Sequence, residues 1–84
     1  MSGTLFVVAT PIGNLEDITA RALRVLREAS MIAAEDTRRT AQLLARYAIT
    51  TPMTSLHEHN EAQKSASLIA RLERGDHVAL VSDA

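Results

Sequence analysis

Four short polar segments contain most of the residues of this chain that are suited to chemistry and are not explained by packing. They are residues 10–17, 35–39, 57–60 and 82–84. Each segment follows an apolar or β-rich run of the kind that forms a strand. Ligands of open α/β sheets bind beyond the carboxyl ends of the strands. The sequence therefore predicts a functional site where these four segments meet.

The segment 35–39 places two carboxylates beside two guanidiniums. Glu35 and Asp36 precede Thr37, and Arg38 and Arg39 follow it. Such a group can position a substrate, hold a hydroxyl, or bind a phosphate through bidentate arginine contacts at a helix N-terminus. In the alternative interpretation, Asp36 or Thr37 caps a helix and the arginines are solvated. Spacing alone favours neither interpretation.

The segment 57–61 contains two histidines and two glutamates, which invites a metal interpretation. However, His57 and His59 alternate along a strand or loop, so their rings point to opposite sides. The pair also lacks the i, i+4 spacing of a zinc-protease helix. We therefore expect no metal here, and instead contact with a substrate or local hydrogen bonds. His57 is also a candidate acid or base, because the unperturbed pKa of histidine lies near neutrality.

The first and last segments are weaker signals. In the first, Gly13 could let a ligand approach the backbone. The loop matches neither a dinucleotide-binding fingerprint nor a P-loop, and it could also be an ordinary turn in which Asp17 is a helix cap. In the last, Asp83 follows an apolar strand, where its carboxylate could accept hydrogen bonds from a ribose or an amino group.

Strands and helices are predicted to alternate between these segments. The predicted strands are residues 5–9, 31–34, 49–56 and 78–81, and the predicted helices are residues 19–29, 37–47 and about 60–74. Pro52 limits the third strand to a short or edge strand. The order β-α-β-α-β-α-β predicts an α/β fold with a parallel, Rossmann-like sheet and right-handed crossovers.

The same periodicity predicts caps and buried faces. Asp17 or Thr19 is expected to cap the first helix and Asn60 the third, which should end at Gly75. The first strand is expected to be buried on both faces. The residues expected to face inward are Ile18, Ala22, Val25, Leu26, Ala29, Thr40, Ala41, Leu43, Leu44, Tyr47, Ala48, Ala62, Ala66, Ile69 and Leu72, whereas Arg71, Arg74 and His77 are expected to be solvated.

Composition narrows the class of protein. The chain has 84 residues, one domain at most, with a net charge of −1, which does not favour a stand-alone nucleic-acid binder. The absence of cysteine excludes a disulfide scaffold. With no basic leader and no long apolar run, we expect a cytoplasmic protein without a membrane span. Because the chain stops directly after an apolar strand, we expect the sequence to be cut.

The runs LFVVATPIGNLEDIT, IAAEDTRRT, SLHEHNE and VALVSDA occur in this order. On these runs, which together span essentially the whole chain, the sequence resembles the N-terminal part of ribosomal RNA methyltransferases in the tetrapyrrole methylase superfamily, the class III methyltransferases. The resemblance implies transfer of a methyl group from S-adenosyl-L-methionine to the ribose 2′-hydroxyl of a cytidine in 16S small-subunit ribosomal RNA. It also implies two α/β domains with the cofactor between them, a homodimer, and no metal.

Site residues follow from the resemblance by position. Pro11, Gly13 and Asn14 match a loop that lines the cofactor cleft. Asp83 and Ala84 match the start of a second loop that contacts the cofactor, and the Gly-Thr-Pro that should continue this loop is absent. Residues 1–84 would therefore be a truncated N-terminal α/β domain without its C-terminal domain.

The remaining matched residues are expected to face the cleft and the RNA of the 30S subunit. They are Glu35, Thr37, Arg38, His59 and Asn60. The reaction needs a group that accepts the hydroxyl proton, and this group could be Asp36, His57 or a residue of the absent domain. We expect Asp36 to be essential and Arg38 to aid RNA binding.

Two other functions remain open at this stage. One is a methyltransferase of the same superfamily that acts on a tetrapyrrole or another small molecule, and the other is a non-enzymatic α/β binding module. The piece itself is expected to be inactive. We also expect that an edge strand left by the cut pairs with another copy.

Overall fold

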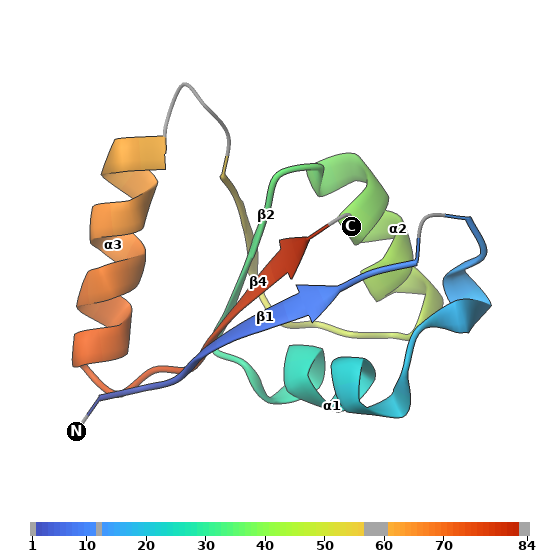
Figure 1. Cartoon of the computed structure of the whole chain (residues 1–84), viewed down its shortest axis with the longest axis horizontal. Coiled ribbons are helices and arrows are strands. Elements are labelled where there is room, and N and C mark those ends of the chain that lie inside the picture. The colour runs from blue at the N-terminus through green and yellow to red at the C-terminus, as the bar shows by residue number, and fades with distance from the viewer. Residues whose placement is uncertain (1, 12, 57–60, 83–84) are drawn as a thin grey trace.

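A computed structural model gives the fold, and it describes residues 2–11, 13–56 and 61–82. The elements in chain order are β1 (Leu5–Ala9), the 3-10 helix η1 (Leu15–Asp17), α1 (Ala20–Glu28), β2 (Met31–Ala34), α2 (Thr37–Arg46), β3 (Met53–Ser55), α3 (Glu61–Glu73) and β4 (Val78–Ser82) (Figure 1). The predicted alternation of strands and helices is confirmed. The short helix η1 was not predicted.

The four strands form one parallel sheet in the order β1-β4-β2-β3. The last strand in the sequence is inserted between the first and the second, with Leu5 and Met31 both in register with Val78. Val78 and Ala79 are fully buried as a result. Strand β4 is therefore central, and the edges of the described sheet are β1 and β3. The expected pairing of an edge strand with another copy stays a prediction.

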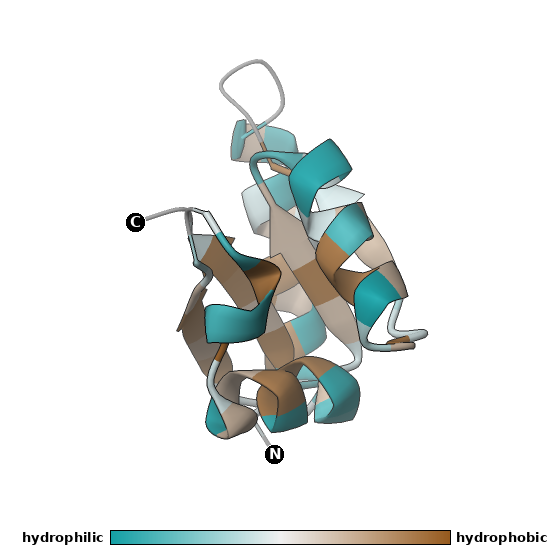
Figure 2. Ribbon diagram, turned by 90° about the vertical axis from the view of Figure 1, so that its right-hand side faces the viewer, coloured by the Kyte–Doolittle hydropathy of each residue, from teal (hydrophilic) through white to brown (hydrophobic). Residues whose placement is uncertain are grey.

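Helices cover both faces of this sheet. Helices α1 and α2 pack on one face, where Leu26 and Leu43 join Val8 and Ile32 in the main hydrophobic core. Helix α3 lies on the opposite face (Figure 1). Figure 2 shows the hydrophobic colouring gathered on the strands and the hydrophilic colouring on the outer sides of the helices. Layers of this kind are the α/β architecture that the element order predicts.

Side-chain caps start the first two helices. The Thr19 hydroxyl accepts a hydrogen bond from the Ala22 N–H at 3.0 Å, so Thr19 and not Asp17 caps α1. The Asp36 carboxylate accepts a hydrogen bond from the Arg39 N–H at 3.0 Å and caps α2. Each cap satisfies a backbone donor that the first helical turn leaves open. The expected third cap, Asn60, lies outside the described residues.

The C-terminal end of α3 is a tightly bonded turn. Gly75 has φ 102°, its N–H donates to the Leu72 carbonyl, and the Asp76 N–H donates to the Arg71 carbonyl. This double closure is a Schellman motif, which places glycine in the left-handed conformation. The predicted role of Gly75 as the helix stop is confirmed.

The residues around this turn make more polar contacts than the sequence indicated. The Asp76 carboxylate forms ion pairs with Arg71 at 3.8 Å and Arg74 at 2.8 Å. His77 Nδ1 accepts a hydrogen bond from the Thr4 N–H at 3.0 Å. Arg74 and His77 are exposed, as expected, and Arg71 is half-buried. All three also tie the α3–β4 turn and the start of β1 together, which the sequence did not indicate.

Burial differs from the prediction on the α3 face of the sheet. Leu5 and Val7 of β1 are 48% and 62% exposed, so β1 is not buried on both faces. As an edge strand in this sheet, it has one face against α1 and one face that α3 only partly covers. The inward stripe expected on α3 is confirmed in part: Leu72 is half-buried, and Ile69, although 54% exposed, lines with it a pocket against the sheet. Ala62 and Ala66 are exposed, and Leu68, which was not expected to face inward, is half-buried.

The prediction for α2 needs a smaller correction. Thr40, Leu43 and Leu44 are buried as predicted, but Ala41 and Ala48 are exposed. Ala48 cannot continue the helical stripe because it follows the end of α2 and adopts φ 54°. The turn that this conformation makes directs the chain into Ile49, which is buried.

Two glycines give opposite expectations for stability. A Cβ at Gly3 would lie 1.8 Å from the Asp76 carbonyl oxygen, whereas a Cβ at Gly13 would meet nothing within 4 Å. Gly3→Ala should therefore lower the free energy of unfolding by about 1–3 kcal/mol, as overpacking does. Gly13→Ala should leave it unchanged or raise it by up to about 1 kcal/mol. Urea unfolding of both variants tests this pair, and equal effects would contradict it.

Candidate functional site

The polar segments leave the sheet at a single edge. In the parallel register, Ala9 lies beside Ser82, and Ala34 lies beside Val81 and Ser55. Two backbone hydrogen bonds extend this alignment beyond the strands: Thr10 N–H to the Ser82 carbonyl at 3.1 Å, and Leu56 N–H to the Ala34 carbonyl at 2.8 Å. The described parts of the segments 10–17, 35–39 and 82–84 are therefore neighbours, as predicted, whereas the segment 57–60 lies outside the described residues.

The topology singles out one place along this edge. After β2 the chain turns to α2 on one face of the sheet, and after β3 it continues to α3 on the other face. Neighbouring strands whose connections depart to opposite faces leave a crevice between their carboxyl ends, where ligands of open α/β sheets bind. Glu35 and Asp36 begin beside this point, directly after β2. The described geometry thus favours the segment 35–39 as part of a site.

Within this segment the two arginines differ. The Arg39 guanidinium is half-buried and donates a hydrogen bond to the Pro11 carbonyl, which joins the first turn of α2 to the first loop. Glu35 and Arg38 are exposed, and within the described part of the chain neither side chain has a hydrogen bond or an ion pair. Thr37 is half-buried at the first position of α2. Of the two arginines, only Arg38 is therefore open to a ligand.

Asp36 combines two properties. Its side chain is the cap of α2, through one carboxylate oxygen bonded to the Arg39 N–H. The residue is nevertheless exposed at the carboxyl edge of the sheet. Of the two caps that the sequence left open for this helix, the structure selects Asp36. A carboxylate held in this way is fixed in position and still accessible, which are requirements for accepting a proton from a bound substrate.

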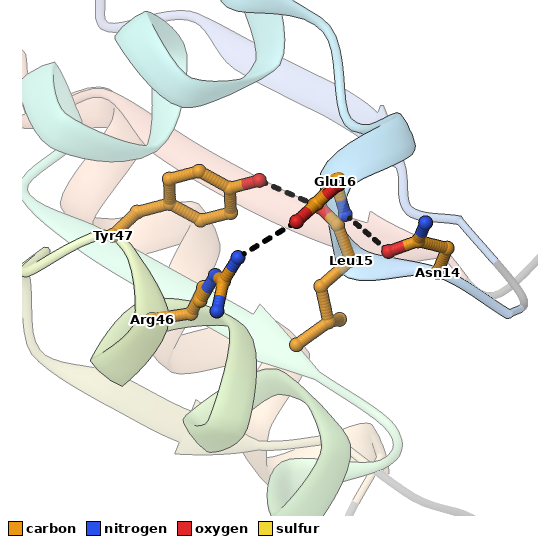
Figure 3. A network of polar contacts seen from close by, with 5 residues as sticks. All are labelled: Asn14, Leu15, Glu16, Arg46 and Tyr47. Carbon is orange, nitrogen blue, oxygen red and sulfur yellow. Dashed lines mark hydrogen bonds and ion pairs between the residues drawn. The ribbon is translucent and has the colours of Figure 1, made fainter.

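The first loop is held against α2 by side chains that the sequence did not identify as a unit (Figure 3). Asn14 Oδ1 accepts a hydrogen bond from the Glu16 N–H at 3.0 Å and starts η1. The Tyr47 hydroxyl donates to the Leu15 carbonyl at 2.8 Å, and Arg46 pairs with Glu16 at 3.0 Å. Tyr47 was expected only as a core residue. It also fixes the loop, and no local sequence signal predicts a bond that spans 32 residues.

Gly13 stands at the open part of this loop. It is exposed, its φ is not in the left-handed region, and no atom lies within 4 Å of the position of a Cβ. Neither backbone conformation nor packing among the described residues therefore requires glycine here. Free space beside a backbone without a side chain is what a closely approaching ligand needs. The interpretation of this loop as a binding loop remains a prediction that this geometry favours.

Several predicted site residues cannot be placed. His57, His59, Asn60, Asp83 and Ala84 lie outside the described residues. In the ranges 2–11, 13–56 and 61–82, no group of three or more His, Cys, Asp or Glu side chains is arranged to hold a metal ion. No helix in the same ranges is long and apolar enough to cross a membrane. The described site therefore consists of the first loop and the start of α2.

Comparison with known families decides the relationship of this chain. The model of the tetrapyrrole (corrin/porphyrin) methylases matches residues 4–83. The chain belongs to the tetrapyrrole methylase family. The parallel α/β sheet described above agrees with this membership, and the resemblance first seen in four sequence runs is confirmed. The matched range includes the first loop and the start of α2, which form the described candidate site.

Individual relatives are more specific. The chain is 58% identical to ribosomal RNA small subunit methyltransferase I of Pseudomonas aeruginosa, over 99% of this chain and 29% of the relative. It is 55% identical to the protein of that name from Escherichia coli O157:H7, over 98% of this chain and 29% of the relative. It is 57% identical to the one from Halalkalibacterium halodurans, over 98% of this chain and 28% of the relative. The chain thus spans less than a third of the length of these relatives.

The contact between Arg39 and the first loop gives a testable expectation. Arg39→Gln removes the bond to the Pro11 carbonyl, so amide hydrogen exchange in the loop should accelerate and the free energy of unfolding should fall by about 1 kcal/mol. Arg46→Gln is the matched control, because Arg46 and Glu16 have side chains that are 54% and 66% exposed. An exposed pair contributes about 0–1 kcal/mol. Equal exchange rates in the Arg39 variant and the wild type would contradict the expectation.

Proposed function

We propose that the full-length protein carrying this segment transfers a methyl group from S-adenosyl-L-methionine to the ribose 2′-hydroxyl of a cytidine in 16S small-subunit ribosomal RNA. The observation that carries the proposal is the identity of 50–58% with eight bacterial proteins that share one name, ribosomal RNA small subunit methyltransferase I. These matches cover 98–100% of this chain, including the segments at the carboxyl edge of the sheet. Methylation of a tetrapyrrole, which the family description mentions, is the alternative.

The first loop suits the cofactor. S-adenosyl-L-methionine supplies a methyl group on a positively charged sulfur. Pro11, Gly13 and Asn14 would hold it, together with Asp83 and Ala84. Support comes from the open space beside Gly13 and from Asn14, whose recorded hydrogen bond uses only Oδ1, so that its amide nitrogen can still donate to a ligand. The bond from Arg39 to the Pro11 carbonyl would keep this loop in place during binding.

The residues after β2 suit the chemical step. The ribose hydroxyl oxygen forms a bond to the methyl carbon while the carbon–sulfur bond breaks, and the hydroxyl proton must pass to a base. Asp36 is our candidate for this base, with His57 as the alternative. Arg38 is exposed and without a partner among the described residues, so its guanidinium can bind an RNA phosphate beside the reacting ribose. Glu35, Thr37, His59 and Asn60 would complete the substrate surface.

The proposal also concerns the partner, oligomeric state and location of the whole protein. We expect the 30S subunit or its RNA as the partner, a homodimer, and a location in the cytoplasm, where ribosomes are. This segment would form one wall of the cofactor cleft, with the other wall in the remaining part of a protein that has the length of the relatives. Residues 1–84 on their own should then have no methyltransferase activity.

Calorimetric titration with S-adenosyl-L-methionine tests the divided cleft. The full-length protein should bind the cofactor, and residues 1–84 alone should not, because half of the contacts are missing. Circular dichroism of the short chain is the necessary control for folding. Binding of equal affinity to both proteins would contradict the divided cleft. Absence of binding to either, with both folded, would contradict the proposed cofactor.

The role of Asp36 can be separated from its role as a helix cap. Asparagine caps a helix about as well as aspartate but cannot accept the proton. In the full-length protein, Asp36→Asn should therefore lower the methylation rate by about 100- to 10,000-fold, the usual contribution of a general base, at unchanged thermal stability. Asp36→Ala should lower both the rate and the stability. A wild-type rate in the Asn variant would exclude Asp36 as the base.

A further inference from the structure

A pocket lies between α1 and the amino-terminal half of β1, outside the candidate site. It has a volume of about 210 Å³ and is formed by α1, by Phe6 of β1 and by His77, which precedes β4. Arg21, Arg24 and Glu28 line it from successive turns of α1. Nothing in the proposed chemistry uses these residues.

The two arginines stand out from the other cations of the chain. Of the nine arginine and lysine side chains, all within the described ranges, six form a hydrogen bond or an ion pair: Arg27, Arg39, Arg46, Lys64, Arg71 and Arg74. The remaining three are Arg21, Arg24 and Arg38, for which the described part of the chain offers no such partner. Two of these three free guanidiniums therefore line one pocket, and Arg38 lies at the candidate site.

His77 adds a donor with a fixed position. Its Nδ1 accepts a hydrogen bond from the Thr4 N–H at 3.0 Å, so in the neutral ring the proton is on Nε2. The ring also contacts Phe6 edge-on, with centroids 6.0 Å apart. Two arginines and a histidine thus line the same pocket as the apolar residues Phe6, Val25 and Ala29. This combination suits an anion that is attached to a weakly polar group such as a ribose.

The charge of the pocket narrows the class of ligand that it can bind. Two arginines and Glu28 give a formal charge of +1 with neutral histidine (+2 − 1). A phosphodiester carries one negative charge and balances it, whereas the second charge of a terminal phosphate would be repelled by Glu28. The arginine geometry, a planar fork of donors, matches two phosphate oxygens.

The distance between the two sites favours a polymer. The pocket is lined by Phe6 in the amino-terminal half of β1, whereas the first loop follows the carboxyl end of this strand. An RNA strand, unlike a mononucleotide, carries further phosphodiesters on both sides of a bound ribose, and one of these could reach the pocket. We propose that the pocket of Arg21, Arg24 and His77 binds a phosphodiester of the RNA substrate at a distance from the methylated nucleotide. This inference rests on the proposed function.

Binding of a small-subunit ribosomal RNA fragment to the full-length protein tests the inference. The double variant Arg21→Gln/Arg24→Gln should bind this RNA roughly ten-fold more weakly, and the slope of log affinity against log salt should decrease in magnitude by about 1 to 2. Both side chains have no partner among the described residues, so thermal stability should not change. Glu28→Gln should act in the opposite direction and bind the RNA more tightly, because it removes the negative charge of the pocket.

Arg74→Gln is the matched control. It removes one positive charge, half of that lost in the double variant, from the exposed residue that follows α3 on the other face of the sheet, and should leave RNA affinity within two-fold of wild type. If the double variant bound the RNA with the affinity and salt slope of the wild type and still methylated it, the pocket would be excluded as an RNA site, and the proposed function would stand. Wild-type protein that binds cofactor but no RNA would overturn the proposed function and the pocket with it. Displacement of the RNA by adenosine monophosphate at equal nucleotide concentration would show a mononucleotide site and overturn the inference.

Discussion

The insertion of β4 between β1 and β2 is the constraint on which the rest of the structure depends. It joins residue 5 to residue 78, and closing a loop of this length costs about 4 kcal/mol beyond a constant. Ladder hydrogen bonds on both sides of β4 contribute about 1 kcal/mol each, and burial of a valine contributes about 1.5–3 kcal/mol. Val78 and Val81 are both buried, so their burial and the two ladders offset the closure cost and the ordering of the strand backbone. Without β4, β1 would have no partner strand in this sheet.

The same insertion brings together the residues of the candidate site and of the proposed pocket. Because all four strands are parallel, their carboxyl ends meet at one edge, which receives the first loop and the start of α2. Their amino ends meet at the other edge, where His77 enters β4 beside Phe6 and α1. Polar residues that are far apart in the sequence therefore become neighbours through backbone pairing alone. Side chains such as Tyr47 and Arg39 then fix the loops that the sheet has brought together.

Much of the fold was predictable because its signals are local. Apolar runs gave the strands, helical spacing gave α1 and α2, and Gly75 marked the end of α3. The strand order was not predictable, since pairing of β4 with both β1 and β2 leaves no periodic trace in the sequence. The inward face of α3 was predicted only in part for a related reason: alanines at helical spacing fit either side, and the residues that line the space against the sheet are Leu68, Ile69 and Leu72. For the site, residue types located the segments, but only tertiary structure separated Arg39 from Arg38.

The distribution of paired and free arginines also resolves an apparent conflict between charge and function. A net charge of −1 argued against RNA binding by this segment, because backbone binding rests on clustered cations. Net charge, however, averages over residues that neutralise one another locally. Asp76 is held by Arg71 and Arg74, and Glu16 by Arg46, so these charges project little field. Arg38, at the candidate site, and Arg21 and Arg24, in the proposed pocket, are the cations for which the described residues offer no partner. A near-neutral chain can therefore present two separate positive sites to one extended polyanion.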